Sequence, residues 1–290
     1  MNPPSTAEAS AALTERQKMA LVNLLADEDP AVYQTIRARI ISCGQSSAEW
    51  LRPHLLSPDP ALRRRAQEII DYFARQDCDT AFLSFCLRQG EDFVIEDGIW
   101  LLARTQYPNI NVEAYRALLD SYAGDLRERI DFNDPSEHIL ATLNQLLFAE
   151  LGFEGNVKNY SDPENSYLNR VMDRRTGNPI SLCLVYLMLA RRLRLPVVGI
   201  GLPGHFVCRF QSAVDELYID VFNKGKLLSK ANCVKYLLHT QHSLADGHLV
   251  PMSARRMLLR VCANLHQIYL QNNFTDESTR LQRYIVLLAR

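Results

Sequence analysis

The most constraining feature of the sequence is a helix without a polar face. Gly177-Asn178-Pro179 is a helix-start signal, with Asn178 as the N-cap and Pro179 as the first helical residue. The segment that follows, from Pro179 to about Arg194, is apolar nearly all round in its first three turns. A helix of this kind must be covered on every side. The sequence therefore predicts a globular fold built around one central helix.

Signals for β-strands are confined to the stretch directly after this helix. The predicted strands are Val197–Ile200, Phe206–Phe210 and Glu216–Val221. The last two flank a short polar loop, which predicts an antiparallel hairpin. Because helical patterns fill the rest of the chain, the predicted fold class is α+β, with a helical N-terminal layer, an α+β core and a C-terminal helix pair.

Helices on both sides of this core have their own signals. Asp29-Pro30 and Asp59-Pro60 each place Asp at an N-cap and Pro at the first helical position. Their spacing suggests helical repeats of the HEAT type, and a plain helical bundle explains it equally well. Near the other end, Ser253–Leu270 and Asp276–Leu288 form a helix pair that resembles one tetratricopeptide hairpin. The expected organisation is a helical region over 1–135, a core domain over 136–230 and a helical tail over 231–290.

The predicted hairpin brings a histidine and an aspartate together. If Phe210 pairs with Asp215, His205 lies directly opposite Asp220, and directly paired side chains share one face of a sheet. The carboxylate can then accept a hydrogen bond from one imidazole nitrogen, which fixes the tautomer and leaves the other nitrogen free. A slip of one residue would place the two side chains on opposite faces. The alternative is a buried histidine held by an ordinary hydrogen bond.

A buried helix followed by a sheet that carries His and then Asp is the chain order of papain-like and transglutaminase folds. Their nucleophile is a cysteine at the helix N-terminus, where the helix dipole lowers the thiol pKa and backbone N–H groups bind the oxyanion. Here the first turn offers Ser181, and the nearest thiol is Cys183. The two are rotated by about 200° around the helix, so only one could face His205. Their structural alternatives are a bond from Ser181 back to Asn178 and a small core residue at Cys183.

Five motifs make the comparison more specific. They are Leu147–Asn156, Asn165–Asn169, Arg175–Leu182, Pro203–Phe206 and Ile219–Asn223. With these motifs the sequence resembles the bacterial SirB/YchA-type family, an uncharacterised group, over about residues 95–290. The resemblance implies a transglutaminase-like domain, here from about Ile139 to Ser229, followed by a tetratricopeptide-like tail.

The resemblance also assigns site residues. His205 and Asp220 match the transglutaminase His and Asp, whereas none of the residues from Pro179 to Ser181 is the expected cysteine. Val221 stands where the family usually has proline. The chain therefore has the acid–base pair of the family without its nucleophile.

Two functions of different classes are compatible with this pattern. In the first, the core is a non-catalytic platform, and the protein acts as an interaction or regulatory module, because helical repeats commonly present binding surfaces. In the second, the chain is an acyl-transfer enzyme, either a hydrolase or an amide-forming enzyme. Ser181 or Cys183 would attack, and His205 would be the base. Asp220 would orient His205. The missing cysteine favours the non-catalytic function.

One distance separates the two functions. An enzyme needs Ser181 Oγ or Cys183 Sγ within roughly 4 Å of a His205 nitrogen. Loop groups such as Asn156 or Asn165 would then line its cleft.

Charge and composition narrow the set of partners. Lys+Arg is 32 and Asp+Glu is 33, so nothing global directs the chain to nucleic acid or to an acidic membrane. The longest apolar run, Leu182–Ala190, is too short to span a bilayer. Met1–Thr14 contains no basic-then-apolar targeting signal. We therefore expect a cytoplasmic protein whose partner is another protein, and its oligomeric state stays open.

The sequence predicts neither a metal site nor a cofactor. Its seven cysteines are scattered and include no C-x-x-C pair, so a zinc ribbon and a thioredoxin motif are both absent. The thiols are expected to be reduced. His205 and Asp220 could in principle bind a metal with a third histidine, but His239, His242 and His248 are spaced loosely on a polar segment.

Overall fold

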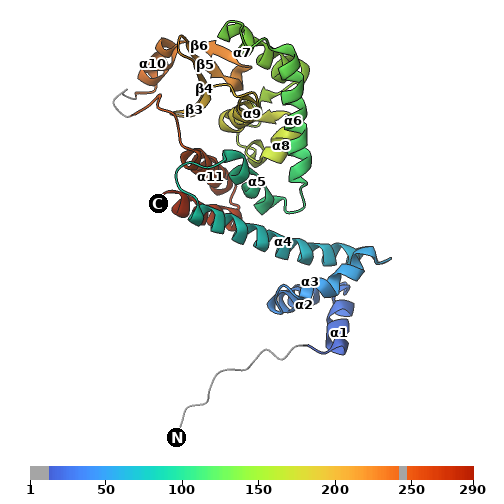
Figure 1. The fold of residues 1–290 in the computed structure, drawn as a ribbon. Helices are drawn as coiled ribbons and strands as arrows, with labels where there is room; N and C mark the ends of the chain where they lie inside the picture. Colours follow the sequence, from blue (N-terminus) through green and yellow to red (C-terminus); the bar gives the residue numbers. More distant parts are fainter. Residues whose placement is uncertain (1–12, 242–246) are drawn as a thin grey trace. The chain divides into compact units, whose positions relative to one another are not determined.

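The computed structural model describes residues 13–241 and 247–290, and the chain divides into two compact units. The first unit ends at Asp77, and the second runs Cys78–Arg290. Helix α4 (Pro60–Arg88) contributes to both. All strands of the described residues, and with them the candidate site, belong to the second unit (Figure 1).

The helices of the first unit begin where the sequence signals place them. They are α1 (Glu15–Leu25), α2 (Pro30–Ser42), α3 (Ser47–Leu51), the 3-10 helix η1 (Arg52–Leu56) and the first part of α4. Asp29 and Asp59 each accept a hydrogen bond from the N–H two residues on, at 2.8 Å, so both predicted Asp-Pro helix starts are confirmed. The apolar sides of these helices form a core of their own, which includes Leu25, Ile40 and Ile69. The HEAT type of repeat stays a prediction.

Three helices lead into the core of the second unit. They are α5 (Ile95–Gln106), α6 (Val112–Arg129) and α7 (Ser136–Asn144). A π-helical segment, η2 (Gln145–Glu150), continues α7. The segment ends at Gly152, whose φ of +75° glycine adopts without strain, and the Phe153 N–H donates to the Leu147 carbonyl at 2.9 Å.

The segment after Asp162 forms two short helices with a break between them. Asp162 and Pro163 do open a helix, but it is one 3-10 turn, η3 (Pro163–Asn165), and α8 (Leu168–Arg174) begins anew after it. The break has a physical reason. The Asn165 carbonyl turns away from a helical partner and accepts hydrogen bonds from the Asn178 N–H (3.2 Å) and from Ser181 Oγ (2.6 Å). The loop is thereby tied to the start of the next helix.

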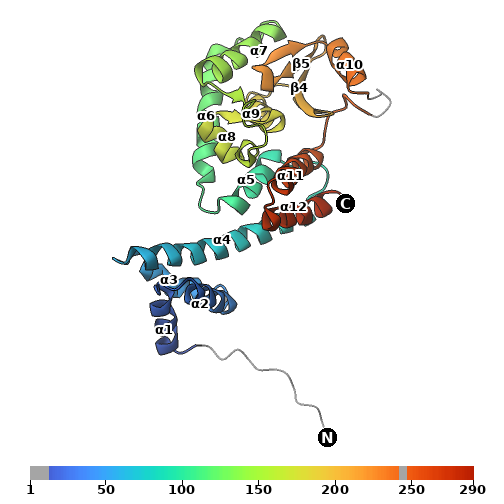
Figure 2. The ribbon, with the colours of Figure 1, turned by 180° about the vertical axis from the view of Figure 1, so that it is seen from behind.

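That next helix, α9 (Pro179–Arg192), is the central helix that the sequence predicts. Every residue from Pro179 to Ala190 is buried. It packs against the main sheet and against α6, α8 and α11 (Ala254–Gln271), and it lies in the middle of the second unit in both views (Figures 1 and 2). The predicted N-cap, Asn178, is confirmed.

The main sheet is antiparallel and has the strand order β3-β4-β5-β6. Its strands are β3 (Val197–Leu202), β4 (His205–Gln211), β5 (Glu216–Asp220) and β6 (Lys226–Leu228). The three predicted strands and their hairpin are confirmed. The prediction misses β6 and a separate parallel pair, β1 (Glu154–Gly155) with β2 (Thr176–Gly177). Two or three residues are too few to produce an alternating pattern.

Side chains of the main sheet alternate between two cores. Phe206 and Cys208 belong to the large core around α9. Val207 and Tyr218 belong to a smaller core that includes residues of α10 (Lys230–His239). The two faces of the sheet are therefore both covered, one by α9 and the other by α10.

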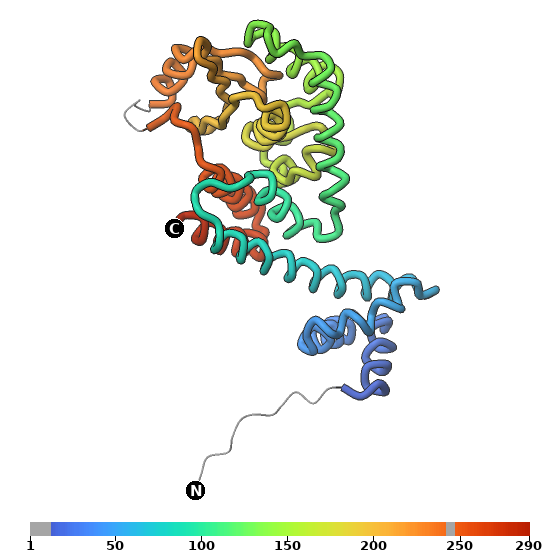
Figure 3. The backbone as a smooth tube through the Cα atoms, viewed as in Figure 1, coloured from blue at the N-terminus to red at the C-terminus, as the bar shows by residue number. Residues whose placement is uncertain are grey.

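The C-terminal helices α11 and α12 (Thr275–Leu288) pack side by side (Figure 3). Arg255 in α11 donates hydrogen bonds to the Leu288 carbonyl (3.0 Å), the Cys86 carbonyl (3.2 Å) and the Gln89 carbonyl (3.0 Å). One buried guanidinium thus joins the C-terminal ends of α12 and α4, where carbonyl groups lack helical partners and carry partial negative charge.

The predicted α+β fold class is confirmed, with helices first, the α+β core next and the helix pair last. The tetratricopeptide class of the pair and the boundaries 1–135, 136–230 and 231–290 stay predictions. Within the described ranges, no helix is both long and apolar enough to cross a membrane.

Candidate functional site

His205 and Asp220 meet at one end of the main sheet. His205 is the first residue of β4, Asp220 is the last of β5, and His205 Nε2 lies 3.0 Å from Asp220 Oδ1. The predicted hydrogen bond is therefore confirmed. The register from which it was predicted is wrong, because Phe210 pairs with Leu217 and not with Asp215. A shift of two residues keeps each side chain on its face, so the pair meets diagonally across the strands.

The Asp220 carboxylate is held in its ionised form. Only 7% of Asp220 is exposed, and burial by itself would raise its pKa. The interaction with His205 and the hydrogen bonds from Asn223 outweigh burial and lower the pKa of Asp220 below its ordinary value. Asn223 donates from Nδ2 to Oδ2 (2.8 Å) and from its backbone N–H to Oδ1 (3.3 Å). An ionised acceptor keeps the His205 proton on Nε2 and leaves a lone pair on Nδ1.

His205 lies between two cavities. The first, about 360 Å³, is bounded by the start of α9 and by α11, and is called here the α9–α11 cleft. The second, about 400 Å³, extends past Asp220 towards α10. No residue in the described part of the chain hydrogen-bonds His205 Nδ1. This nitrogen is therefore the atom through which His205 could accept a proton or contact a ligand.

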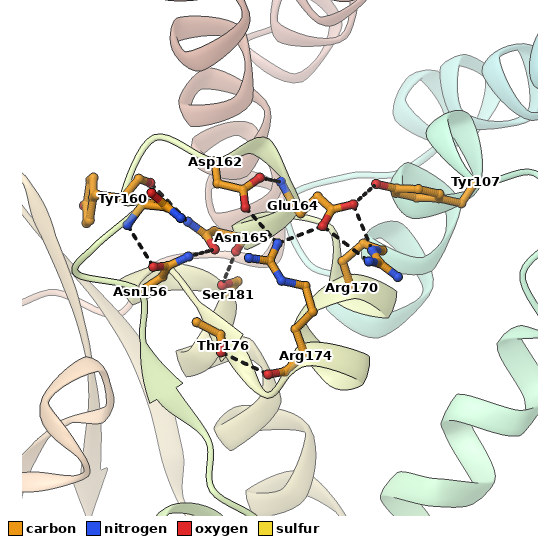
Figure 4. A network of polar contacts seen from close by, with 11 residues as sticks. Tyr107, Asn156, Tyr160, Asp162, Glu164, Asn165, Arg170, Arg174, Thr176 and Ser181 are labelled. Carbon is orange, nitrogen blue, oxygen red and sulfur yellow. Dashed lines mark hydrogen bonds and ion pairs between the residues drawn. The ribbon is translucent and has the colours of Figure 1, made fainter.

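Ser181 belongs to the network at the helix start and not to His205 (Figure 4). Its Oγ accepts a hydrogen bond from the Asn178 N–H (3.0 Å) and donates to the Asn165 carbonyl (2.6 Å). Its N–H donates to Asn178 Oδ1 (3.0 Å), which completes a capping box. The structural alternative for Ser181, a bond back to Asn178, is thus confirmed. Its hydroxyl donates its proton to the backbone carbonyl of Asn165.

Cys183 packs against the opposite side of the sheet from His205. Its thiol is fully buried and donates to the Phe206 carbonyl, with Sγ 3.6 Å from the oxygen. The Phe206 side chain faces α9, whereas alternation turns His205, one residue earlier, to the other face. Burial raises the pKa of the Cys183 thiol, and neighbouring Cys208 and Asp220 raise it further. The predicted burial of Cys183 is confirmed.

The part of α9 that does reach the cleft beside His205 is apolar. Pro179 and Ile180 line the cleft together with His205, in the stretch where the family resemblance places the nucleophile. Neither side chain has a nucleophilic atom. Among the described residues, neither Ser181 nor Cys183 hydrogen-bonds His205, so the two halves of the predicted site are not brought together.

The chain is similar to bacterial proteins over about two thirds of its length. The sequence profile of the transglutaminase-like superfamily matches residues 113–263. A UPF0162 protein of Xylella fastidiosa (strain 9a5c) is 36% identical over 195 residues, which make up 65% of this chain and 69% of the relative. The chain belongs to the transglutaminase-like superfamily.

A human protein is similar to about half of the chain. F-box only protein 21 of Homo sapiens is 35% identical over 153 residues, which are 50% of this chain and 24% of that protein. No solved structure matches the chain significantly. Residues 113–263 contain α9, the main sheet and the first half of α11, so the superfamily match spans the candidate site.

Asn156 and Asn165 do not line the transglutaminase-like cleft, and that prediction is wrong. Both are buried, and Asn156 Nδ2 donates to Asn165 Oδ1 (2.9 Å). Asn165 Nδ2 donates to the Asn159 carbonyl (2.8 Å), so the two buried side-chain amides stabilise the conformation of the loop (Figure 4). Tyr160 and Ser161 of the same loop line the cleft instead. The sequence identifies the loop correctly but assigns the wrong residues to its surface.

The sequence-based prediction misses the wall of the cleft that α11 contributes. Arg260, Asn264, Gln267 and Gln271 line it. Their spacing of four, three and four residues places them on one side of the helix. A polar stripe at helical spacing, on a helix whose other side is apolar, is the signal that could have revealed them.

No group of three or more His, Cys, Asp or Glu side chains within the described ranges is arranged to hold a metal ion. His242, one of the histidines considered as a third ligand, lies outside the described residues.

Proposed function

We propose that this transglutaminase-like chain is non-catalytic and acts as an interaction module that binds another protein. The observation that carries the proposal is the composition of the helix start beside His205. Pro179 and Ile180 line the cleft there, the Ser181 hydroxyl is bonded to the Asn165 carbonyl, and the Cys183 thiol is buried. Acyl transfer needs a nucleophile that can meet the base.

Recruiting Ser181 would require a local rearrangement. Its hydroxyl would have to leave both Asn165 and Asn178, and loss of a helix-start hydrogen bond costs about 1 kcal/mol. The buried Asn165 carbonyl would keep only its longer, 3.2 Å hydrogen bond from the Asn178 N–H. Recruiting Cys183 would require a thiolate in an apolar site, which burial disfavours. These costs favour the non-catalytic function.

A second function, acyl transfer by Ser181 or Cys183, is favoured by a different observation. His205 and Asp220 keep the arrangement of a general base and its orienting carboxylate, with one imidazole nitrogen free. A base held ready in this way would suit a hydrolase or an amide-forming enzyme. The narrower assignment to the SirB/YchA-type family and the cytoplasmic location are part of the proposal.

Turnover measurements decide between the two functions. We expect no turnover of a p-nitrophenyl ester or of a glutamine-amide substrate above that of a His205→Ala variant. His138→Ala is the matched control, because His138 is an exposed histidine of α7. Turnover that is lost in His205→Ala and Ser181→Ala but kept in His138→Ala, with folding intact, would replace the non-catalytic function by the serine triad. Loss in Cys183→Ala in place of Ser181→Ala would assign the thiol.

A further inference from the structure

Arg260 is a partly buried cation at the edge of the α9–α11 cleft. Its Nη2 donates hydrogen bonds to the Leu202 carbonyl (2.6 Å) and to the His205 carbonyl (2.8 Å). Its guanidinium carbon lies 5.6 Å from the centre of the Phe206 ring. α11 thus presents a positive charge directly beside the turn that carries His205.

The charge of Arg260 has no carboxylate partner among the described residues. Arg192, by contrast, contacts Glu96 (2.8 Å) and Asp120 (2.6 Å). Arg255 lies on the carbonyl ends of two helices, where the helix dipoles compensate it. The carbonyls that hold Arg260 belong to a turn between strands, which supplies no such compensation.

Burial lowers the pKa of the Arg260 guanidinium below its usual range, and Tyr160 and Tyr236 are the neighbours that oppose this. An arginine stays charged in a protein, so the uncompensated charge is maintained. The Nε and Nη1 groups have no acceptor in the described part of the chain. Arg260 lines the α9–α11 cleft and also a second cavity beside Gly201, so these groups are available to a ligand.

The remainder of the α11 stripe is made of unpaired amides. No residue of the described ranges hydrogen-bonds the side chains of Asn264, Gln267 or Gln271. Each amide can both donate and accept, as a peptide group does. The stripe therefore matches the alternating donors and acceptors of an extended main chain.

We propose that the α9–α11 cleft binds a carboxylate-bearing polypeptide segment, with the carboxylate on Arg260 and the main chain along the amides of α11. The proposal rests on the proposed function and names the chemistry of its ligand. Arginine binds carboxylates with paired, directional hydrogen bonds. The cleft of about 360 Å³ has one arginine and no lysine in its lining, which suits a single negative charge better than a phosphate. Its volume is within the range of ligand sites, about 300–1,000 Å³.

Four acetylated tetrapeptides test the proposal. They are tetra-alanine with a free C-terminal carboxylate, the same peptide as its amide, and two amidated peptides with Glu or Gln at the second position. Binding is followed through the NMR signals of the Asn264 and Gln267 side-chain amides. We expect the two charged peptides, or one of them, to bind about tenfold more tightly than the neutral ones, the size of one charged hydrogen bond. Which of them binds identifies the carboxylate as C-terminal or side-chain.

Arg260→Gln should remove this preference, whereas Arg256→Gln should keep it. Arg256 is an exposed arginine of the same helix that does not line the cleft, so the control removes the same charge nearby. Because Arg260→Gln could disturb the turn at Leu202, Gln267→Glu is a second variant. Gln267 is exposed, and a negative charge there should weaken the charged peptides by a similar factor without affecting the fold.

Three results would overturn the proposal: no signal change with any peptide, equal binding of charged and neutral peptides, or a preference unchanged in both Arg260→Gln and Gln267→Glu. The failure of the proposed function is distinct, because it would appear as substrate turnover, which none of these titrations measures.

Discussion

The two halves of the candidate site differ in how their polar groups are used. At the helix start, Ser181 and Asn178 hydrogen-bond each other through their side chains and backbone N–H groups. The Ser181 hydroxyl donates its proton to the Asn165 carbonyl. At the sheet end, Asp220 is satisfied by His205 and Asn223. His205 lines two cavities, and its Nδ1 has no hydrogen-bond partner in the described part of the chain. Polar groups at one half hold the chain together, whereas those at the other are left available for a ligand.

This difference separates stability from function within a few residues. A hydroxyl that is saturated by buried hydrogen bonds contributes to the free energy of unfolding, and its removal leaves partners unpaired. A ring nitrogen at a cavity contributes little to that free energy. The two halves should therefore respond in opposite ways to substitution, and four predictions test the contrast.

Ser181→Ala should have the largest effect on stability. The change removes the hydrogen bonds of Ser181 Oγ with the Asn178 N–H and the Asn165 carbonyl, and these two groups keep only the 3.2 Å bond between them. We expect the free energy of unfolding to fall by about 2–3 kcal/mol, because each of the two buried hydrogen bonds that are lost contributes about 0.5–1.5 kcal/mol. Urea titration measures it. Ser161→Ala, at an exposed serine of the neighbouring loop, is the control and should change stability by less than about 0.5 kcal/mol. Equal effects would abolish the contrast.

Asp220→Asn should have an intermediate effect that depends on pH. The folded-state pKa of Asp220 is depressed, so its contribution is present above the unfolded pKa of about 4 and is lost as pH falls through the lower folded value. Near pH 7 we expect a loss of about 2 kcal/mol, from weakened hydrogen bonds to His205 and Asn223.

The difference between wild type and Asp220→Asn should shrink below about pH 4. Urea titrations at pH 7 and at pH 3 measure it. A difference of the same size at both values would mean that Asp220 does not act through its charge.

Ile180→Cys should restore a reactive thiol at the helix start. Ile180 lines the cleft with His205, and a thiol at a helix N-terminus beside a histidine has a lowered pKa. We expect this thiol to react with iodoacetamide about tenfold faster at pH 7 than in the Ile180→Cys/His205→Ala double variant, which corresponds to about 1.4 kcal/mol. Mass spectrometry of the alkylated peptides measures both rates.

The native Cys183 is the internal reference for that experiment and should stay unmodified in the folded protein, because it is fully buried. If the thiols at 180 and 183 react alike, the helix start does not occupy the position of an emptied nucleophile site.

His205→Ala should have the smallest effect on stability, about 1 kcal/mol, the size of the one hydrogen bond to Asp220 that is lost. Its ring is partly exposed at the cavities, and Asn223 still pairs with Asp220 after the ring is removed. Thermal unfolding of the variant beside Ser181→Ala gives the comparison directly. A larger loss in His205→Ala than in Ser181→Ala would reverse the assignment of the two halves.

The sequence predicts the helix-start half well because its signals are local. Asn178 and Pro179 mark the start of α9, and the bond from Ser181 back to Asn178 spans three residues. Burial of Cys183 follows from its apolar neighbours along the helix. Each of these features is decided within one or two turns of the chain.

The sequence predicts the sheet-end half less well because distant contacts decide it. The hairpin closes through Ser212, whose N–H donates to the Asp215 carbonyl (2.9 Å), and Ser136 of α7 donates to the Asp215 carboxylate (2.6 Å). Asp215 is therefore a loop residue and not the partner of Phe210, which shifts the register by two. Ser136 lies 79 positions away in the sequence, beyond the reach of any local pattern.

The wall that α11 contributes is harder still to predict. Arg260 follows His205 by 55 positions, and nothing near either residue indicates that they meet. The α9–α11 cleft exists only once the helix pair has packed onto the α+β core. For this reason, a sequence motif that identifies His205 and Asp220 does not identify the α11 residues that would contact a ligand.

The contacts of Arg255 have a consequence for the order of folding. Arg255 lies 169 positions after Cys86 and 33 positions before Leu288 in the sequence. These residues therefore come together only after a long loop has closed. During synthesis, the end of α4 leaves the ribosome well before its partners exist. The carbonyl groups at the C-terminal end of α4 must remain hydrogen-bonded to water until α11 and α12 have been synthesised. We expect the second unit to acquire protection from proteolysis in one late step, when the segment around Leu288 emerges, and not helix by helix.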